Sequence, residues 1–242
     1  MIGLGTIINT FAIILGATLG ILLHKIIPSR LQNTVMSGIG LSVCFVGISG
    51  VISKMLVFKE NAFDTKDTML MVTSLVVGAF IGELFNIEKQ LERFGNFCKS
   101  HIKSKKENAR FTEGFVSASL LFCVGAMAIV GSLEDGLNGD YTTLFAKSLM
   151  DGTVSIFFAA TMGAGVYLSV LPVVLYQGGI TLLAGVIKPL LSDVLIGQLS
   201  LVGSVLIFAI GLNMCANTKI KTGNLLPAVL VPVLYNILIS IF

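Results

Sequence analysis

An all-α, polytopic integral membrane helix bundle is the fold class that the sequence predicts, and two observations predict it. The chain of 242 residues is 55% hydrophobic and 12% charged, with a mean hydropathy of +0.93, whereas an ordinary soluble domain is about 25% charged. Uncharged stretches also recur along the chain, and Asp151 is the only charged residue between Ser148 and Ile187. Since about 20 apolar residues cross a bilayer as a helix, that stretch is long enough to cross twice.

Eight apolar segments follow one another and together make a single transmembrane domain, residues 1–242. They are Ile2–Leu23, Val35–Leu56, Met69–Phe85, Phe115–Leu133, Leu149–Val170, Val173–Ile187, Val194–Cys215 and Leu225–Phe242. The first lacks a preceding basic region, so we expect it to stay in the protein rather than to be cleaved as a signal peptide. The sixth is short for a crossing, so seven spans plus a re-entrant segment is the alternative to eight.

The distribution of Lys and Arg favours eight spans over seven. Basic residues in short loops are retained on the cytoplasmic side, and the loop 86–112 carries seven of the 16 in this chain. With this loop inside, eight spans place 11 basic residues inside and five outside, whereas seven spans place nine inside and seven outside. The sequence therefore predicts a multi-pass membrane protein with both termini extracytoplasmic.

The loop 86–112 also has a helical pattern. Apolar Ile87, Leu91, Phe94 and Phe97 recur among its charges at three- and four-residue intervals, which is typical of an amphipathic helix lying on a membrane surface. The alternative is a solvated cytoplasmic connector. Either interpretation makes membrane lipids a partner, and the net charge of +3 gives no indication of nucleic acid.

Two halves of the chain, 1–133 and 149–242, share a weak internal repeat. The first and fifth segments match at a constant offset, with Gly5-Thr6, Phe11-Ala12 and Gly16-Ala17 recurring as Gly152-Thr153, Phe158-Ala159 and Gly163-Ala164. A 4+4 duplication would relate the halves by an axis along the membrane normal. The alternative is chance similarity between glycine-rich apolar segments.

The 26 glycines predict close helix packing. Small residues spaced four apart, such as Gly16 with Gly20 and Gly78 with Gly82, let helix backbones approach closely within a membrane. Because there are more such pairs than a small bundle needs, we expect a homodimer. Gly16 and Gly20 are its candidate seam, although packing within one chain could use them equally.

A break in a helix is predicted between Pro172 and Gly179. Pro172 removes a backbone donor, Gly178 and Gly179 weaken the next turn, and Tyr176 and Gln177 bring polar groups to membrane depth. Broken helices in transporters place freed backbone groups around a substrate or ion. The alternative is a tight turn before Pro172, with Gln177 bonding across helices.

Polar residues inside apolar segments complete the candidate substrate- or ion-binding set. They are Asp151, Gln177, Tyr176, Asn9, Thr10, Asn213 and Glu83. Ionisable residues within spans are expensive and are functional candidates by default. The alternatives are that Asp151 stabilises a helix start near Lys147, that Glu83 lies at the membrane interface, and that the amides bond between helices.

Catalytic and cofactor-binding patterns are not recognisable in this chain. No Gly-Lys-Ser/Thr phosphate loop is present, and neither histidine is followed by a metal-ligand residue three or four positions later. Cys44, Cys98, Cys123 and Cys215 are dispersed and are interpreted as small apolar residues. We expect no enzyme activity, no cofactor, no bound metal and no ATP-driven pumping.

Three stretches resemble a bacterial membrane family, domain of unknown function 554. They are Gly5–Thr10 with Gly16 and Gly20, Asp151-Gly152 through Pro172 to Tyr176-Gln-Gly178, and Gly211-Leu-Asn213 through Lys219–Pro227. The resemblance spans nearly the full chain and implies a small multi-pass inner-membrane protein with a role in transport. The expected function is an ATP-independent transporter or channel for a small solute or ion; the alternative is a non-transporting scaffold or sensor.

Overall fold

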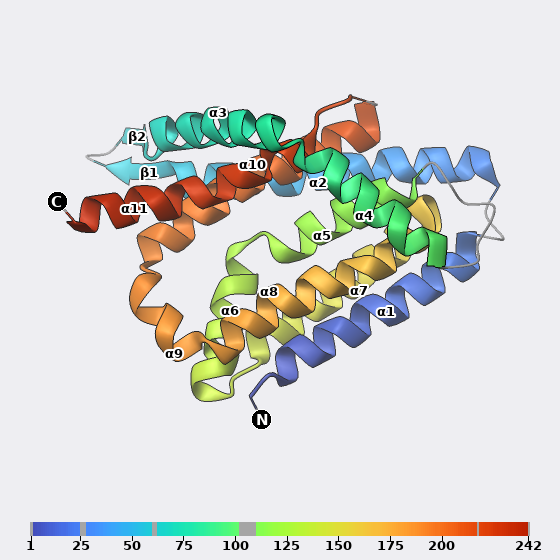
Figure 1. Ribbon diagram of the computed structural model, residues 1–242, viewed down its shortest axis with the longest axis horizontal. Helices are drawn as coiled ribbons and strands as arrows, with labels where there is room; N and C mark the ends of the chain where they lie inside the picture. Colours follow the sequence, from blue (N-terminus) through green and yellow to red (C-terminus); the bar gives the residue numbers. More distant parts are fainter. Residues whose placement is uncertain (1, 25–27, 60–61, 102–109, 217, 242) are drawn as a thin grey trace. The chain divides into compact units, whose positions relative to one another are not determined.

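The protein forms two compact, mostly helical units, each assembled from separate parts of the chain. The computed structural model describes residues 2–24, 28–59, 62–101, 110–216 and 218–241 (Figure 1). Unit 1 contains residues 1–39 and 91–190, and unit 2 contains residues 40–90 and 191–242. The all-α bundle is confirmed. Each unit takes segments from both predicted halves, 1–133 and 149–242, so the units do not coincide with the halves.

Unit 1 is built around a helical hairpin. Its elements are α1 (Leu4–His24), α5 (Phe111–Cys123), α6 (Ala126–Asn138), α7 (Thr142–Met162), the 3-10 helix η1 (Gly163–Ser169), α8 (Val170–Leu182), α9 (Ala184–Ile187) and the 3-10 helix η2 (Lys188–Leu190). The start of α7 and the end of α8 both contact α6, while η1 contacts α5. The chain therefore reverses at η1, and α1 lies along both arms (Figure 1).

Glycines bring α1 and α7 into backbone contact. A Cβ added at Gly16 would lie 2.1 Å from Gly152 O, and one added at Gly20 would lie 2.2 Å from Ile156 O. The residue numbers of the contact positions increase together along both helices, so α1 and α7 run parallel. The expectation that Gly16 and Gly20 form a dimer seam is wrong, because α7 of the same chain already covers them; the homodimer itself stays a prediction.

Unit 2 contains helices that pack in antiparallel directions. Its elements are most of α2 (Ser29–Met55), β1 (Leu56–Lys59), β2 (Ala62–Thr65), α3 (Thr68–Phe85), the start of α4 (Ile87–His101), α10 (Asp193–Ala216), the 3-10 helix η3 (Thr222–Leu230) and α11 (Val231–Ile241). Gly40 lies against Cys215 and Gly50 against Ser204, so α2 and α10 run in opposite directions. Gly78 lies against Ala228 and Gly82 against Asn224, so α3 and η3 do too.

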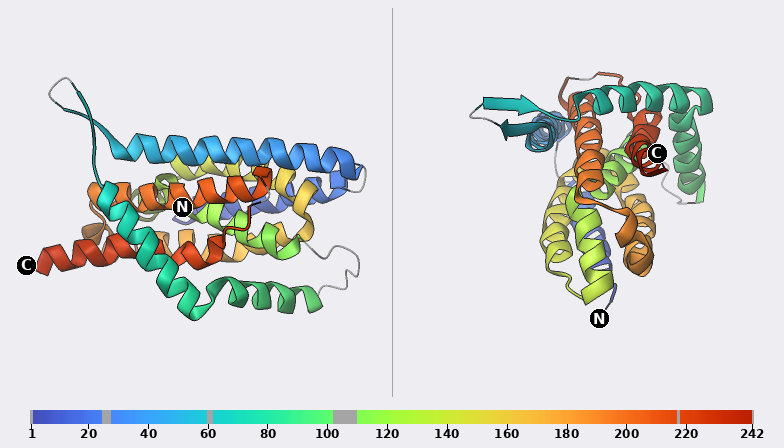
Figure 2. Two further views of the ribbon diagram at one scale, coloured as in Figure 1. Left: turned by 90° about the horizontal axis from the view of Figure 1, so that it is seen from above. Right: turned by 90° about the vertical axis from the view of Figure 1, so that its left-hand side faces the viewer.

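A β-hairpin joins α2 to α3, where the sequence predicted only a connecting loop. β1 and β2 pair antiparallel from Leu56 with Thr65 to Lys59 with Ala62. The rings of Phe58 and Phe63 meet edge to face with centroids 5.4 Å apart, which stabilises such a cross-strand pair. The strands extend beyond the end of α2 (Figure 2).

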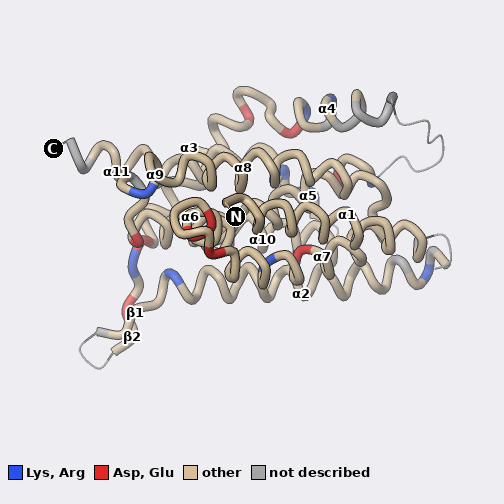
Figure 3. The backbone as a smooth tube through the Cα atoms, turned by 90° about the horizontal axis from the view of Figure 1, so that it is seen from below, with Lys and Arg blue, Asp and Glu red and all other residues tan. Residues whose placement is uncertain are grey.

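Five helical stretches among the described residues are long and apolar enough to cross a membrane. They are Leu4–Leu23, Asn33–Met55, Thr68–Phe85, Thr142–Leu182 and Asp193–Ala216. A sixth arises if α5 and α6, bent by 59° at their junction, form one broken span. Few charged positions interrupt these helices (Figure 3). The predicted seven or eight crossings are not confirmed as a count, because the fourth and eighth segments are each divided into two shorter helices.

The basic loop lies only partly within the described residues. Its first half is α4, a helix as the spacing predicted, with Phe94 and Phe97 exposed and Phe94 also contacting Phe115. Residues 102–109, with three of the predicted cytoplasmic lysines, lie outside the described part of the chain.

Two cysteines far apart in sequence meet between α2 and α10. The Sγ atoms of Cys44 and Cys215 are 4.0 Å apart. In a Cys98→Ser/Cys123→Ser variant, we expect copper-phenanthroline to oxidise Cys44 and Cys215 to a disulfide within one chain. The measurement is maleimide labelling, from which both thiols should then be protected. The same treatment of Cys44→Ser should leave Cys215 reactive. Unchanged labelling in the two-cysteine protein would contradict this pairing of α2 with α10.

Candidate functional site

A buried polar cluster, made of Asn9, Lys147, Asp151 and Gln177, connects α1, α7 and α8 in unit 1. Asn9 Nδ2 donates to Asp151 Oδ2 at 3.0 Å and to Gln177 Oε1 at 3.1 Å. Lys147 Nζ donates to the same Asp151 oxygen at 2.6 Å. Asn9 and Gln177 are fully buried, and the Lys147 and Asp151 side chains are 7% and 8% exposed. The structure thus joins three residues predicted separately and adds Lys147.

Several polar atoms in and beside the cluster have no hydrogen-bond partner among the described residues. Within the cluster these are Asn9 Oδ1 and Gln177 Nε2. One turn away they include Thr6 Oγ1 on α1 and Thr181 Oγ1 on α8, and Thr6 contacts α8 beside Gly178. A buried polar group without a partner costs about 1–3 kcal/mol. Their concentration at one place makes the cluster the candidate site of unit 1.

In the core of unit 1, the buried polar atoms of described residues that lack partners are not spread evenly about the cluster. Toward the start of α1, Ser132 is buried and Asp135 accepts hydrogen bonds from the backbone of Gly3 and Gly5 at 3.1 and 3.0 Å. Toward the end of α1, the fully buried side chains include Ile13, Ala17, Phe158, Val166 and Val173, together with Ser155 and Ser169, whose hydroxyls donate to nearby backbone carbonyls. Among the described residues of unit 1, the buried polar atoms without partners therefore lie in the cluster itself and toward the start of α1, at Thr6, Ser132 and Thr181.

The helix break lies elsewhere than predicted. The expectation of a break at Pro172, Gly178 and Gly179 is wrong, because α8 runs unbroken through all three. Pro172 is the third residue of α8, in the first turn, where a backbone N–H lacks an intrahelical acceptor anyway. The chain instead turns at η1 and breaks between α5 and α6, where Gly125 has a φ of +132°.

The α5–α6 break lies near the cluster. Both α5 and α6 contact α7 and α8, the helices that carry Lys147, Asp151 and Gln177. Tyr176 is the neighbour of Gln177 on α8, and its role in the site stays a prediction. Broken helices beside buried polar groups are the arrangement that lines sites in transporters.

The charges of the cluster cancel. An isolated charge buried in a low-dielectric interior is penalised by several kcal/mol, and a close partner with added hydrogen bonds offsets this. Lys147 lies one turn before Asp151 on α7, and Asn9 supplies the second donor to the carboxylate. The pair can therefore remain ionised inside the bundle, and it adds no net charge to the site.

Three other predicted residues do not join this cluster. The hydroxyl of Thr10 donates to Thr6 O of its own helix. Asn213 belongs to unit 2, where its amide donates to Ile220 O at 2.8 Å and its Oδ1 accepts from Ile220 N at 3.0 Å. Asn213 thereby fixes the loop after α10. Glu83 also belongs to unit 2. Neither Asn213 nor Glu83 is a member of the cluster.

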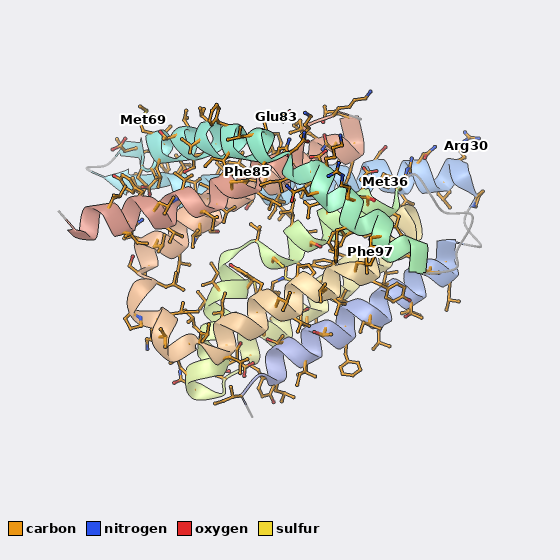
Figure 4. The ribbon with its side chains drawn as sticks, viewed as in Figure 1. Arg30, Met36, Met69, Glu83, Phe85 and Phe97 are labelled. Carbon is orange, nitrogen blue, oxygen red and sulfur yellow. The ribbon has the colours of Figure 1, made fainter. Side chains whose placement is uncertain are left out.

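Glu83 lies at the corner between α3 and α4 (Figure 4). Its carboxylate accepts hydrogen bonds from Lys221 Nζ at 2.7 Å and from Asn224 Nδ2 at 2.6 Å. Both members of the Glu83–Lys221 pair are more than half exposed. The hydrogen bond from the ammonium to Glu83 raises the pKa of Lys221 above its ordinary value. The exposure of this pair at the end of α3 favours the alternative interpretation, that Glu83 lies at the membrane interface.

A second polar network, in unit 2, provides an internal comparison. Gln198 Nε2 donates to Asp67 Oδ1 at 2.9 Å, and Asn236 Nδ2 donates to Gln198 Oε1 at 2.6 Å. It joins α10, α11 and the start of α3, as the cluster in unit 1 joins three helices. Its buried side-chain atoms are paired within the described residues, whereas those of Asn9 and Gln177 are not. The unfilled hydrogen-bonding capacity therefore distinguishes the cluster in unit 1 from this network.

Only one of the additional residues of the site has a signal in the sequence. Lys147 stands one turn before Asp151, but this spacing is equally typical of a helix end. Thr6, Thr181 and Ser132 carry no signal distinct from other hydroxyls in apolar segments. Among the described residues no three His, Cys, Asp or Glu side chains come together as metal ligands would.

Comparisons with known proteins agree with a membrane-embedded fold. The family described as "Protein of unknown function (DUF554)" matches residues 4–237. The chain is 34% identical over 229 residues to the uncharacterized membrane protein YdfK of Bacillus subtilis, covering 94% of this chain and 93% of that one. It is 30% identical over 231 residues to the uncharacterized protein YqgA of Escherichia coli, with the same coverage. No solved structure matches it.

Proposed function

This chain belongs to the DUF554 family, and from that premise we propose that it is an ATP-independent transporter or channel for a small solute or ion. The observation that carries the proposal is the buried polar cluster with its unpaired Asn9 Oδ1 and Gln177 Nε2. A protein that used these residues only to pack helices would gain by pairing them, because unpaired amides inside a membrane are expensive. A solute passing through the site would supply the missing partners.

Helix directions within each unit support an eight-span topology for this transporter. The first and fifth segments, α1 and α7, run parallel, while the second and seventh, α2 and α10, run antiparallel. Both relations follow from eight alternating crossings, whereas a re-entrant sixth segment would make α2 and α10 parallel. With the termini extracytoplasmic in a bacterial inner membrane, the start of α1, with the unpaired hydroxyls of Thr6, Ser132 and Thr181, faces the outside.

Uptake into proteoliposomes tests the proposal. We expect protein-dependent uptake of at least one solute from a metabolite mixture, presented at two pH values and measured by mass spectrometry. Asn9→Leu should abolish it, because the amide bridges Asp151 and Gln177. Folded yield should fall little, since an interhelical hydrogen bond in a membrane is worth about 0.6 kcal/mol.

Thr10→Val is the matched control, because the Thr10 hydroxyl bonds only to its own helix. It should transport like the wild type. The competing function is a scaffold or sensor, favoured by the direct bonds that link α1, α7 and α8. An absence of uptake by the wild-type protein, with Asn9→Leu losing the folded protein instead, would support the scaffold.

A further inference from the structure

We propose that the cluster in unit 1 binds a small zwitterion, a molecule that carries both an ammonium and a carboxylate, as an α-amino acid does. This inference rests on the proposed transport function and names the chemical class of its substrate. It follows from three properties of the cluster: the fixed orientation of its amides, the balance of its unfilled donors and acceptors, and its zero net charge.

The orientation of both amides is fixed by their neighbours. Asn9 Nδ2 faces two acceptors, Asp151 Oδ2 and Gln177 Oε1, so a flipped Asn9 would place its oxygen against two other oxygens. The same contact requires Gln177 to present Oε1 to Asn9. The groups left over are therefore one acceptor, Asn9 Oδ1, and one donor, Gln177 Nε2.

The ion pair adds one charged group of each kind. The Lys147 ammonium has three donors, of which one is used on Asp151 Oδ2. The other carboxylate oxygen of Asp151 takes no hydrogen bond from a described residue. A ligand thus meets Lys147 with Gln177 Nε2 as donors and Asp151 with Asn9 Oδ1 as acceptors. Thr6 and Thr181 can act as either, because hydroxyls rotate.

Ligands of a single charge leave half of this set unused. A cation would satisfy Asp151 and Asn9 but face the Lys147 ammonium, and an anion would satisfy Lys147 and Gln177 but face the Asp151 carboxylate. Either would also bring an uncompensated charge into a buried site that is neutral without it, against the desolvation penalty. A zwitterion keeps the site neutral, with its carboxylate on Lys147 and Gln177 and its ammonium on Asp151 and Asn9.

A set of size-matched probes separates these classes. Alanine carries both charges, ethylammonium only the positive one, propionate only the negative one, and lactamide neither. The zwitterions to be tested are α-amino acids, β-alanine and γ-aminobutyrate. We expect at least one of them to raise the unfolding midpoint of the purified protein saturably and to enter proteoliposomes. Ethylammonium, propionate and lactamide should do neither.

Variants test whether the response comes from this cluster. Lys147→Met/Asp151→Asn removes both charges together, leaves no buried charge unpaired, and should weaken zwitterion binding about a hundredfold. Gln177→Met should weaken it less, because it removes one neutral donor. Thr10→Val should respond as the wild type does. An unchanged midpoint shift in Lys147→Met/Asp151→Asn would overturn the assignment to this cluster.

The outcomes separate this inference from the transport function on which it rests. Uptake of a singly charged or neutral solute, sensitive to Asn9→Leu and without any zwitterion response, would overturn the zwitterion and leave transport standing. An absence of uptake of every probe and metabolite by folded wild-type protein would count against both. Zwitterion stabilisation without uptake would support the binding site and overturn transport.

Discussion

Asp151→Asn should destabilise the protein by about 3–5 kcal/mol, because it leaves the Lys147 ammonium buried without its partner. The two side chains lie 2.6 Å apart and are less than a tenth exposed. Adding Lys147→Met should restore most of the folded protein, since removing both members of a buried ion pair is often neutral. The measurements are monodisperse yield by size-exclusion chromatography and the thermal unfolding midpoint.

The Glu83–Lys221 pair provides the matched control for this prediction. Its N–O distance of 2.7 Å is nearly the same, but its side chains are 56% and 57% exposed. Exposed pairs contribute little because water and salt screen them, so Lys221→Met should leave yield and midpoint close to those of the wild type. If Asp151→Asn were equally harmless, or if Lys147→Met failed to rescue it, the buried pair would not have the role that the geometry gives it.

This prediction differs from the one that sequence alone supports. From the sequence, Asp151 is expected near the start of an apolar helix. Asparagine would replace aspartate at such a position at little cost, because both residues cap helix starts well. In the structure α7 begins nine residues earlier, at Thr142. Asp140 is the acid at that end: hydrogen bonds from the hydroxyl and backbone of Thr142 hold its pKa below the ordinary value. Apolarity alone does not locate the start of α7, because the polar residues Thr142, Thr143 and Lys147 are helical too.

The membrane character and most helix positions could be predicted because they depend on local composition. The meeting of Asn9 with Asp151 and Gln177 could not, since 142 and 168 residues separate them along the chain. The helix break was misplaced for a related reason. Pro172 and the two glycines favour a break wherever they occur within a helix, but proline in a first turn disturbs nothing, and only the structure shows where that turn lies.

Gly16→Ala should also have a large effect, because it would drive α1 away from α7. The added Cβ would lie 2.1 Å from Gly152 O and 3.0 Å from Ser155 Cβ, and a backbone atom cannot yield as a flexible side chain can. Overpacking of this kind typically costs about 1–3 kcal/mol. Asn9 stands two turns earlier on the same helix, so the 3.0 Å bond to Asp151 should lengthen and uptake should fall.

Gly179→Ala is the control that distinguishes this clash from a general effect of alanine. Gly179 lies in α8, and a Cβ there would meet nothing within 4 Å. Alanine is a better helix former than glycine by about 1 kcal/mol, so this variant should be as stable as the wild type or more so.

The pair of variants also tests the dimer seam expected from sequence. If Gly16 served an interface between copies, Gly16→Ala would dissociate a crosslinkable dimer and leave the protomer stable; because Gly16 lies against Gly152 of the same chain, we expect the protomer itself to lose stability.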